Sequence, residues 1–257
     1  MPRFFCPEPM EVGATIVLPE KVAHHVHVLR LGADATITLF NGEGGEYSAR
    51  LVKSESSPEL ATGKKEGRVP TRTQQQAQIK VHHPVEIELP YALTLAQALP
   101  EGSKMDWIVE KAVELGAFGL QALSSQRSVV KLNEERAQKK HEHWQNIVVS
   151  ASEQCGRNRL MRLPELSNFQ DWIMQQDLHR RVLLSPRAMF SLSDWARHHP
   201  PQALTIVVGP EGGFTELEEN MALQHDALML GLGPRVLRTE TCGMAALATL
   251  NAIWGGI

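Results

Sequence analysis

Residues 204–214 read LTIVVGPEGGF, a short apolar run that leads directly into a loop of glycine and proline. The same arrangement recurs at residues 227–241, ALMLGLGPRVLRTET, where a second apolar run enters a second such loop. Short apolar runs bounded by glycine and proline are typical of buried strands. Glycines let the backbone of a loop approach a ligand closely, and ligands bind at the carboxyl ends of strands in open α/β sheets. The two loops therefore predict an enzyme site at one edge of a sheet.

Working outward from these loops, the chain divides into two predicted domains. Residues 1–72 alternate short apolar runs with turns, and two of these runs flank the glycine turn at 41–45, which predicts a hairpin in a small β-rich domain. Residues 55–78 are polar and predict a linker or a long exposed loop. From about residue 81, strands alternate with helices. We therefore predict a second domain over 73–257, of α/β class with a mainly parallel sheet.

The elements of the second domain follow from periodicity and capping signals. Thr215 and Glu218 have the spacing of a capping box, so a helix should begin right after the first glycine loop. Either Thr239 or Thr241 should cap the last helix. Strands are expected at 91–95, 120–123, 181–184 and 204–208, and helices at 105–115, 133–154, 169–176 and 192–198.

Composition excludes several classes of protein. The 257 residues carry a net charge of −3, which argues against a protein that holds nucleic acid by bulk charge alone. Cys6, Cys155 and Cys242 are odd in number and widely spaced, so neither a disulfide framework nor a zinc knuckle is expected. No apolar run is long enough to span a bilayer and no signal peptide is evident, so we expect a cytoplasmic protein without a membrane partner.

Familiar ligand motifs do not fit either. The chain has no G-x-x-x-x-G-K-[ST] motif, which argues against a P-loop. The stretch GLGPRV at 231–236 has Val236 where a Rossmann fingerprint has its third glycine. Neighbouring histidines at 24–27, 82–83 and 141–143 lack cysteine or carboxylate partners at ligand spacing, so no metal site is expected.

The arginines at 157–162 are typical either of a solvated surface loop or of a local basic patch.

The two loops together carry a resemblance. GPEGGF at 209–214 with LGPRVLRTET at 232–241 looks like the signature of the RsmE family, the 16S ribosomal RNA (uracil-1498-N3)-methyltransferases of the SPOUT superfamily. The sequence CGM at 242–244 departs from the small residues expected at the start of the last helix. Further matches follow in order at RFF 3–5, His25, VLR 28–30, FNG 40–42, KMD 104–106, KAVELG 111–116, RSVV 127–130 and EQCGR 153–157.

The resemblance implies a fold, a reaction and partners. The fold would be a small PUA-like β-barrel that docks RNA, followed by an α/β methyltransferase domain with a parallel sheet and a SPOUT-type trefoil knot. The cofactor would be S-adenosyl-L-methionine, held bent in the knot, and the reaction would need no metal. The partners would be 16S rRNA in the small ribosomal subunit and a second copy of the chain, because a homodimer would complete each site.

Chemistry at uracil N3 suggests roles for three residues. The N3 proton leaves only at about pH 9 to 10, near the range of a phenol, so the enzyme must help it leave or stabilise the uracil anion. Arg238 is proposed to stabilise that anion through a charge-assisted hydrogen bond. Glu211 or Glu240 is the candidate base or orients the arginine. Equally, an arginine and a glutamate in one loop can simply pair to fix its shape.

Further candidates surround these three. Leu232 and Leu237 would wall the adenine, although they can also be ordinary core residues. The full cofactor-binding set is Leu184, Ser185, Gly209, Pro210, Glu211, Gly212, Leu230, Gly231, Leu232, Gly233 and Leu237. Basic side chains on a docking surface position the RNA backbone, and the predicted RNA-binding set is Arg3, His25, Arg30, Lys104, Arg157 and Arg235.

Three other functions stay open from the sequence. The chain could methylate another atom or another RNA, such as a ribose 2′-hydroxyl. It could be a noncatalytic RNA-binding or ribosome-assembly protein, against which the intact Arg238 and both glycine loops argue. A nucleotide-dependent oxidoreductase is disfavoured by the missing third glycine.

Overall fold

A computed structural model of the chain describes residues 1–52, 75–176 and 179–256. These residues form two compact units, one of Met1–Ile87 with Gly156–Arg159 and the other of Glu88–Cys155 with Leu160–Ile257. The boundary expected at residue 72 lies outside the described residues. The division falls instead between Ile87 and Glu88, because the strand that follows residue 75 pairs within the N-terminal unit.

The N-terminal unit is a five-stranded sheet with one short helix. The predicted hairpin is confirmed, since β3 and β4 pair antiparallel with Thr36 opposite Arg50. The sheet order is β1-β3-β4-β5-β2, so in the described part of the chain β1 and β2 are edges and the sheet is not closed into a barrel. The element bounds are β1 (Arg3–Phe5), β2 (Thr15–Val17), α1 (Glu20–Val28), β3 (Thr36–Phe40), β4 (Glu46–Val52) and β5 (Gln76–His83).

The strand β5 was not expected, because its first residues belong to the polar stretch read as a linker. Ala77 and Ile79 are nevertheless wholly buried, and they alternate with outward-facing polar residues as one face of a strand requires. They pack in the core of this unit with Ile37, Leu39 and Leu51. A polar strand with two inward apolar residues gives too short a pattern to stand out in the sequence.

The second unit is built on a seven-stranded sheet whose pairings are all parallel, as predicted. The strand order is β10-β12-β9-β11-β6-β7-β8. Its strands are β6 (Leu93–Ala98), β7 (Gly119–Ser124), β8 (Ser167–Asn168), β9 (Arg180–Leu184), β10 (Phe190–Ser191), β11 (Leu204–Val208) and β12 (Leu228–Gly231). Its helices are α2 (Lys104–Glu114), α3 (Glu134–Cys155), α4 (Phe169–Ile173), α5 (Leu192–Arg197), α6 (Glu216–Gln224) and α7 (Thr239–Trp254).

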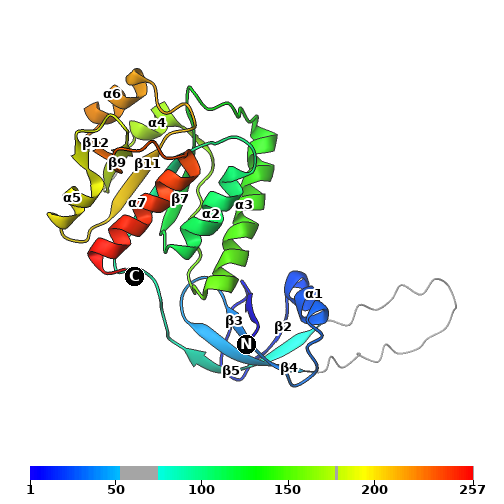
Figure 1. Cartoon of the computed structure of the whole chain (residues 1–257). Coiled ribbons are helices and arrows are strands. Elements are labelled where there is room, and N and C mark those ends of the chain that lie inside the picture. Colours follow the sequence, from blue (N-terminus) through cyan, green and yellow to red (C-terminus); the bar gives the residue numbers. More distant parts are fainter. Residues whose placement is uncertain (53–74, 177–178, 257) are drawn as a thin grey trace. The chain divides into compact units, whose positions relative to one another are not determined.

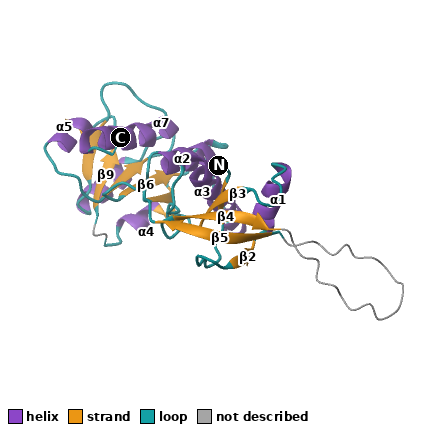
Figure 2. Ribbon diagram, turned by 90° about the horizontal axis from the view of Figure 1, so that it is seen from below, coloured by secondary structure: helices purple, strands orange, loops and turns teal. Residues whose placement is uncertain are grey.

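Both faces of this sheet are covered by helices (Figures 1 and 2). On one face, Leu95 and Ile206 belong to the core shared with α2, α3, α5 and α7. On the other face, Ala96 and Val207 pack with residues of α4 and α6, including Phe169. Successive strand residues therefore point into two different cores, which explains why these strands read as continuous apolar runs.

The starts of the last two helices differ in how they are capped. At α6 the predicted capping box is present, with the Thr215 hydroxyl accepting from the Glu218 amide at 3.2 Å. At α7 the prediction that Thr239 or Thr241 is the cap is wrong. The N-cap is Arg238, without a side-chain cap, because the Thr239 hydroxyl is used elsewhere and donates to the Gly209 carbonyl at 2.6 Å.

No helix in the described ranges is both long enough and apolar enough to span a membrane.

Candidate functional site at the carboxyl edge of the parallel sheet

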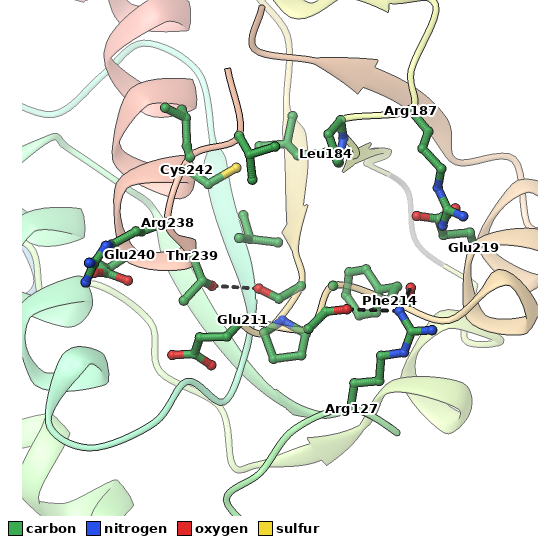
Figure 3. Close-up of a pocket in the computed structure, with 18 of the residues that line it drawn as sticks. Arg127, Leu184, Arg187, Glu211, Phe214, Glu219, Arg238, Thr239, Glu240 and Cys242 are labelled. Carbon is green, nitrogen blue, oxygen red and sulfur yellow. Dashed lines mark hydrogen bonds and ion pairs between the residues drawn. The ribbon is translucent and has the colours of Figure 1, made fainter. Parts of the chain in front are cut away.

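The loops that follow β9, β11 and β12 meet at the carboxyl edge of the sheet and enclose an open cavity of about 570 Å³ (Figure 3). A smaller hollow of about 60 Å³ shares five of its wall residues, Leu184, Pro186, Val236, Leu237 and Cys242. Parallel strands end at the same edge of a sheet, so residues far apart in the sequence converge here. The cavity has the size of a small-molecule site, for which roughly 300–1,000 Å³ is usual.

At Gly209 and Gly212 the first glycine loop leaves little room for a side chain. A Cβ atom at Gly209 would lie 3.1 Å from the amide nitrogen of Phe214 within the same loop. A Cβ atom at Gly212 would lie 3.3 Å from the Cβ of Arg127. The glycines therefore leave the backbone of residues 209–213 exposed along one wall of the cavity, where Leu184, Val208 and Leu237 add an apolar surface.

A buried hydrogen-bond chain joins the two glycine loops. Gln97, which is wholly buried on β6, donates from Nε2 to the Thr239 hydroxyl at 2.9 Å. Thr239 in turn donates to the Gly209 carbonyl at 2.6 Å (Figure 3). The chain holds the first residue of α7 against the loop after β11. It thereby places Arg238 and Glu240, the two neighbours of Thr239, on the wall of the cavity.

Four cationic side chains line the cavity, and three of them are engaged. Lys104 forms an ion pair with Glu211. Arg127 donates to the carbonyls of Gly212 at 2.9 Å and Phe214 at 3.4 Å. Arg187 donates to Glu219 at 2.5 Å.

The fourth cation, Arg238, is exposed. Among the described residues its guanidinium makes no hydrogen bond or ion pair. Arg238 is therefore the cavity cation that is available to a ligand.

The two candidate bases differ in their surroundings. Partial desolvation raises the pKa of Glu211, but hydrogen bonds from the Lys104 ammonium and from backbone amides, including that of Glu101, outweigh it and lower the pKa overall. The same hydrogen bond raises the pKa of Lys104. Glu211 is thus an ionised partner of Lys104 and a weak proton acceptor. Glu240, by contrast, has its Oε2 atom buried with no hydrogen-bond partner in the described part of the chain.

Most of the residues predicted to bind the cofactor lie together. Leu184 and Leu237 line both hollows, and the others are divided between them: Gly209, Pro210, Glu211 and Gly212 line the larger, and Ser185, Leu232 and Gly233 line the smaller. Leu230 and Gly231 line neither. Leu230 packs in the core, and its carbonyl accepts from the Ser185 amide at 3.1 Å, so it supports the wall from behind.

The predicted RNA-binding residues fall into three groups. Lys104 and Arg235 line the hollows just described. Arg3 and Arg157 lie inside the N-terminal unit, where Arg3 pairs with Glu46 at 2.5 Å and donates to the Arg157 carbonyl at 2.7 Å, and Arg157 is only 4% exposed.

The third group, His25 on α1 and Arg30 just after it, is exposed. Exposed basic side chains can contact a phosphate, so the exposure of His25 and Arg30 is compatible with the RNA contact predicted for them, which stays a prediction. Arg3, by contrast, is engaged within the unit by Glu46 and by the Arg157 carbonyl.

Several wall residues were missed by sequence reasoning, notably Arg187, Thr239 and Cys242 as lining groups. Arg127 stood out only as part of a family match. A signal was present, because Arg127 and Arg187 each follow a strand within three residues and therefore lie at the carboxyl edge. The partner of Thr239 could not be read from the sequence, since Gly209 lies 30 residues away.

No group of three or more His, Cys, Asp or Glu side chains that could hold a metal ion occurs in the part of the chain that the structure describes.

Comparison with known proteins supplies the family. The family model for the RNA methyltransferase domain matches residues 87–251, and the model for the RNA methyltransferase PUA domain matches residues 18–60. A solved ribosomal RNA small subunit methyltransferase E from Neisseria gonorrhoeae, bound to S-adenosyl methionine, is 34% identical with a TM-score of 0.85, covering 99% of this chain and 98% of that one. The chain belongs to the ribosomal RNA small subunit methyltransferase E family.

Two further similar proteins agree with this assignment. Ribosomal RNA small subunit methyltransferase E of Bacillus subtilis is 38% identical over 171 residues, which are 64% of this chain and 67% of that protein. A putative methyltransferase of Legionella pneumophila, solved with S-adenosyl methionine, is 31% identical with a TM-score of 0.86, over 98% and 97% of the two chains. The predicted family and α/β fold class with a PUA-like N-terminal part are confirmed, while the knot stays a prediction.

The thiol of Cys242 offers a test of the cavity wall. Burial raises the pKa of this thiol to about 11, so only about a thousandth of it is thiolate at pH 8. We expect iodoacetamide to alkylate it about a hundred-fold more slowly than glutathione at that pH, with the rate rising as the pH approaches 11. Mass spectrometry of the peptide that contains Cys242, with Cys242→Ser to assign it, measures this. Alkylation at the glutathione rate would contradict the described burial.

Proposed function

We propose that this chain transfers a methyl group from S-adenosyl-L-methionine to N3 of one uridine, uracil-1498, of 16S rRNA in the small ribosomal subunit. The observation that supports it most is the Arg238 guanidinium, which lacks an internal partner among the described residues and stands on the wall of a glycine-lined cavity. The family and its S-adenosyl methionine-bound members give the reaction class. The geometry adds a charge suited to an anionic base.

The cavity fits S-adenosylmethionine in its chemistry. Leu184, Val208 and Leu237 form an apolar surface suited to an adenine ring, and the backbone of residues 209–213 supplies hydrogen-bonding groups beside it. When bound, the cofactor supplies the methyl group as the electrophilic carbon of a sulfonium. The chain contributes orientation and charge, and no metal is needed for this displacement.

Arg238 would act on the acceptor base. Uracil N3 becomes a good nucleophile only when its proton has left, and the negative charge then spreads over the neighbouring carbonyl oxygens. A guanidinium that donates to such an oxygen stabilises the anion, and it does so most strongly where water is excluded. Arg238 is unpaired within the described residues, so it can donate without first breaking an internal ion pair.

Between the two carboxylates, Glu240 is the better proton acceptor. Glu211 is committed to Lys104, and its lowered pKa makes it a poor base. Glu240 lines the same cavity with an unpaired buried oxygen, and it lies two residues from Arg238. We therefore assign proton removal to Glu240 and a structural role to the Lys104–Glu211 pair.

The remaining family properties complete the proposal. His25 and Arg30 would contact RNA phosphates, Arg235 and Lys104 would face the RNA near the cavity, and a homodimer with a trefoil knot would complete the site. The target uracil must leave any base stack to reach the cavity, as bases modified by enzymes do.

Methyl transfer to small ribosomal subunits that lack this modification tests the proposal. Label from S-adenosylmethionine should enter the RNA and appear as 3-methyluridine on nucleoside analysis. Label in a 2′-O-methylated nucleoside would contradict the assigned atom. Binding of the cofactor without transfer would favour another RNA, and absence of both would favour a noncatalytic protein.

Replacement of Arg238 tests the assigned role directly. In Arg238→Ala, kcat should fall about 10²- to 10³-fold, the cost of removing one donor to a developing oxyanion. The calorimetric Kd for S-adenosylmethionine should change less than about twofold, because this side chain acts on the base. The control is Arg197→Ala, which removes an exposed arginine on α5 and should leave both values unchanged. Loss of cofactor binding in Arg238→Ala would make the residue structural.

A further inference from the structure

Two consecutive glutamates in the first turn of α6 are buried, and the second of them, Glu219, lies on the wall of the cavity. Glu218 is fully buried and Glu219 is 8% exposed, although glutamate is among the residues least often buried. A buried carboxylate is costly unless it is paired and hydrogen-bonded. Their partners therefore indicate what the burial achieves.

The two side chains hold loops on different sides of the first glycine loop. Consecutive residues of a helix point about 100° apart, so the two carboxylates diverge. Glu218 accepts from the Gln126 amide at 2.8 Å, in the loop after β7. Glu219 accepts from the Ser185 hydroxyl at 3.3 Å and from Arg187 at 2.5 Å, in the loop after β9.

The contacts of Glu219 form a closed set. Its Oε1 atom takes the Ser185 hydroxyl, its Oε2 atom takes the Arg187 guanidinium, and the Arg187 amide donates back to the Ser185 hydroxyl at 3.2 Å. We name Ser185, Arg187 and Glu219 the Glu219 brace. Ser185 lines the smaller hollow, and Arg187 and Glu219 both line the larger one, so the brace forms part of the wall of the site (Figure 3).

We propose that Glu219 is a positioning residue for cofactor binding, acting through Arg187 to hold the loop after β9 against the loop after β11. The inference rests on the proposed function for the identity of the cofactor, S-adenosylmethionine. A loop that is already held in place binds its ligand without a further loss of conformational entropy. The brace should thus serve the affinity for the cofactor more than the methyl-transfer step.

Glu219→Gln tests this with minimal change of shape. The amide oxygen still accepts from Ser185, but the charge that holds Arg187 is lost. We expect the calorimetric Kd and the KM for S-adenosylmethionine to rise about tenfold or more, while kcat at saturating cofactor falls less than about threefold, the pattern of lost uniform binding. The matched control is Glu216→Gln. Glu216 lies 3.7 Å from the same arginine but its side chain is 85% exposed, so its loss should change Kd less than about twofold.

A double-mutant cycle separates positioning from general destabilisation. Arg187→Gln should raise Kd about as much as Glu219→Gln, and the double variant should be no worse than either single variant, because one contact is broken in all three. Additive losses, or a Kd for Glu219→Gln within twofold of the unmodified chain, would overturn the proposal. If Glu219→Gln fails to fold, Arg187→Gln decides alone, since its side chain is half exposed.

Hydrogen exchange distinguishes failure of the brace from failure of the proposed function. In Glu219→Gln, the amide hydrogens of Ser185, Arg187 and Ala188 should exchange faster than in the unmodified chain, whichever cofactor the site binds. Faster exchange in a chain that transfers no methyl group to RNA would support the brace and count against the proposed function. Unchanged exchange at these amides would overturn the brace.

Discussion

The hydrogen bond from the Thr239 hydroxyl to the Gly209 carbonyl is the contact on which the site depends. It joins the start of the last helix to the loop after β11. The sheet brings these two segments near one another, and the hydrogen bond fixes them together. The donor is itself fixed by Gln97 from the middle of the sheet. Because Thr239 is buried and Gly209 is partly buried, leaving the Gly209 carbonyl without a donor would cost about 1–3 kcal/mol. The position of Arg238 follows from this one bond.

The charged side chains of the cavity divide into those that have a partner within the protein and those that do not. Lys104, Arg127 and Arg187 are each held by a carboxylate or by backbone carbonyls, so they shape the loops. Arg238 and the Oε2 atom of Glu240 have no such partner among the described residues, and the proposed function assigns substrate contact to them. In the proposed reaction, a chain of net negative charge can act on RNA because one cation, Arg238, is placed locally beside the base.

Much of this fold could be predicted from the sequence, because its strongest signals are local. The apolar runs of β9 and β11, the period of α3 and the capping box at Thr215 each lie within a few residues. The cap of α7 was predicted wrongly, since Thr239 satisfies a carbonyl 30 residues away and no local rule reveals that partner. The strand β5 was missed because its residues are mostly polar, although two of them point inward.

The site was predictable in its glycine loops and less so in its charges. Arg238 and Glu240 stood out beside a glycine loop, but the sequence could not tell that Glu211 is paired with Lys104, 107 residues away. It also could not separate Arg3 and Arg157, which are internal, from the exposed His25 and Arg30. Pairing and burial are properties of the folded chain, and they decide which charged residues are available.

The most direct measurement is the single-turnover rate of methyl transfer to small ribosomal subunits in Thr239→Val and Thr239→Ser at saturating S-adenosylmethionine. Valine keeps the shape of the side chain but removes the hydroxyl, whereas serine keeps the hydroxyl. If the bond to Gly209 sets the position of Arg238, the rate should fall at least tenfold in Thr239→Val and stay within about threefold in Thr239→Ser. A Thr239→Val protein that transfers methyl at the unmodified rate would contradict the account.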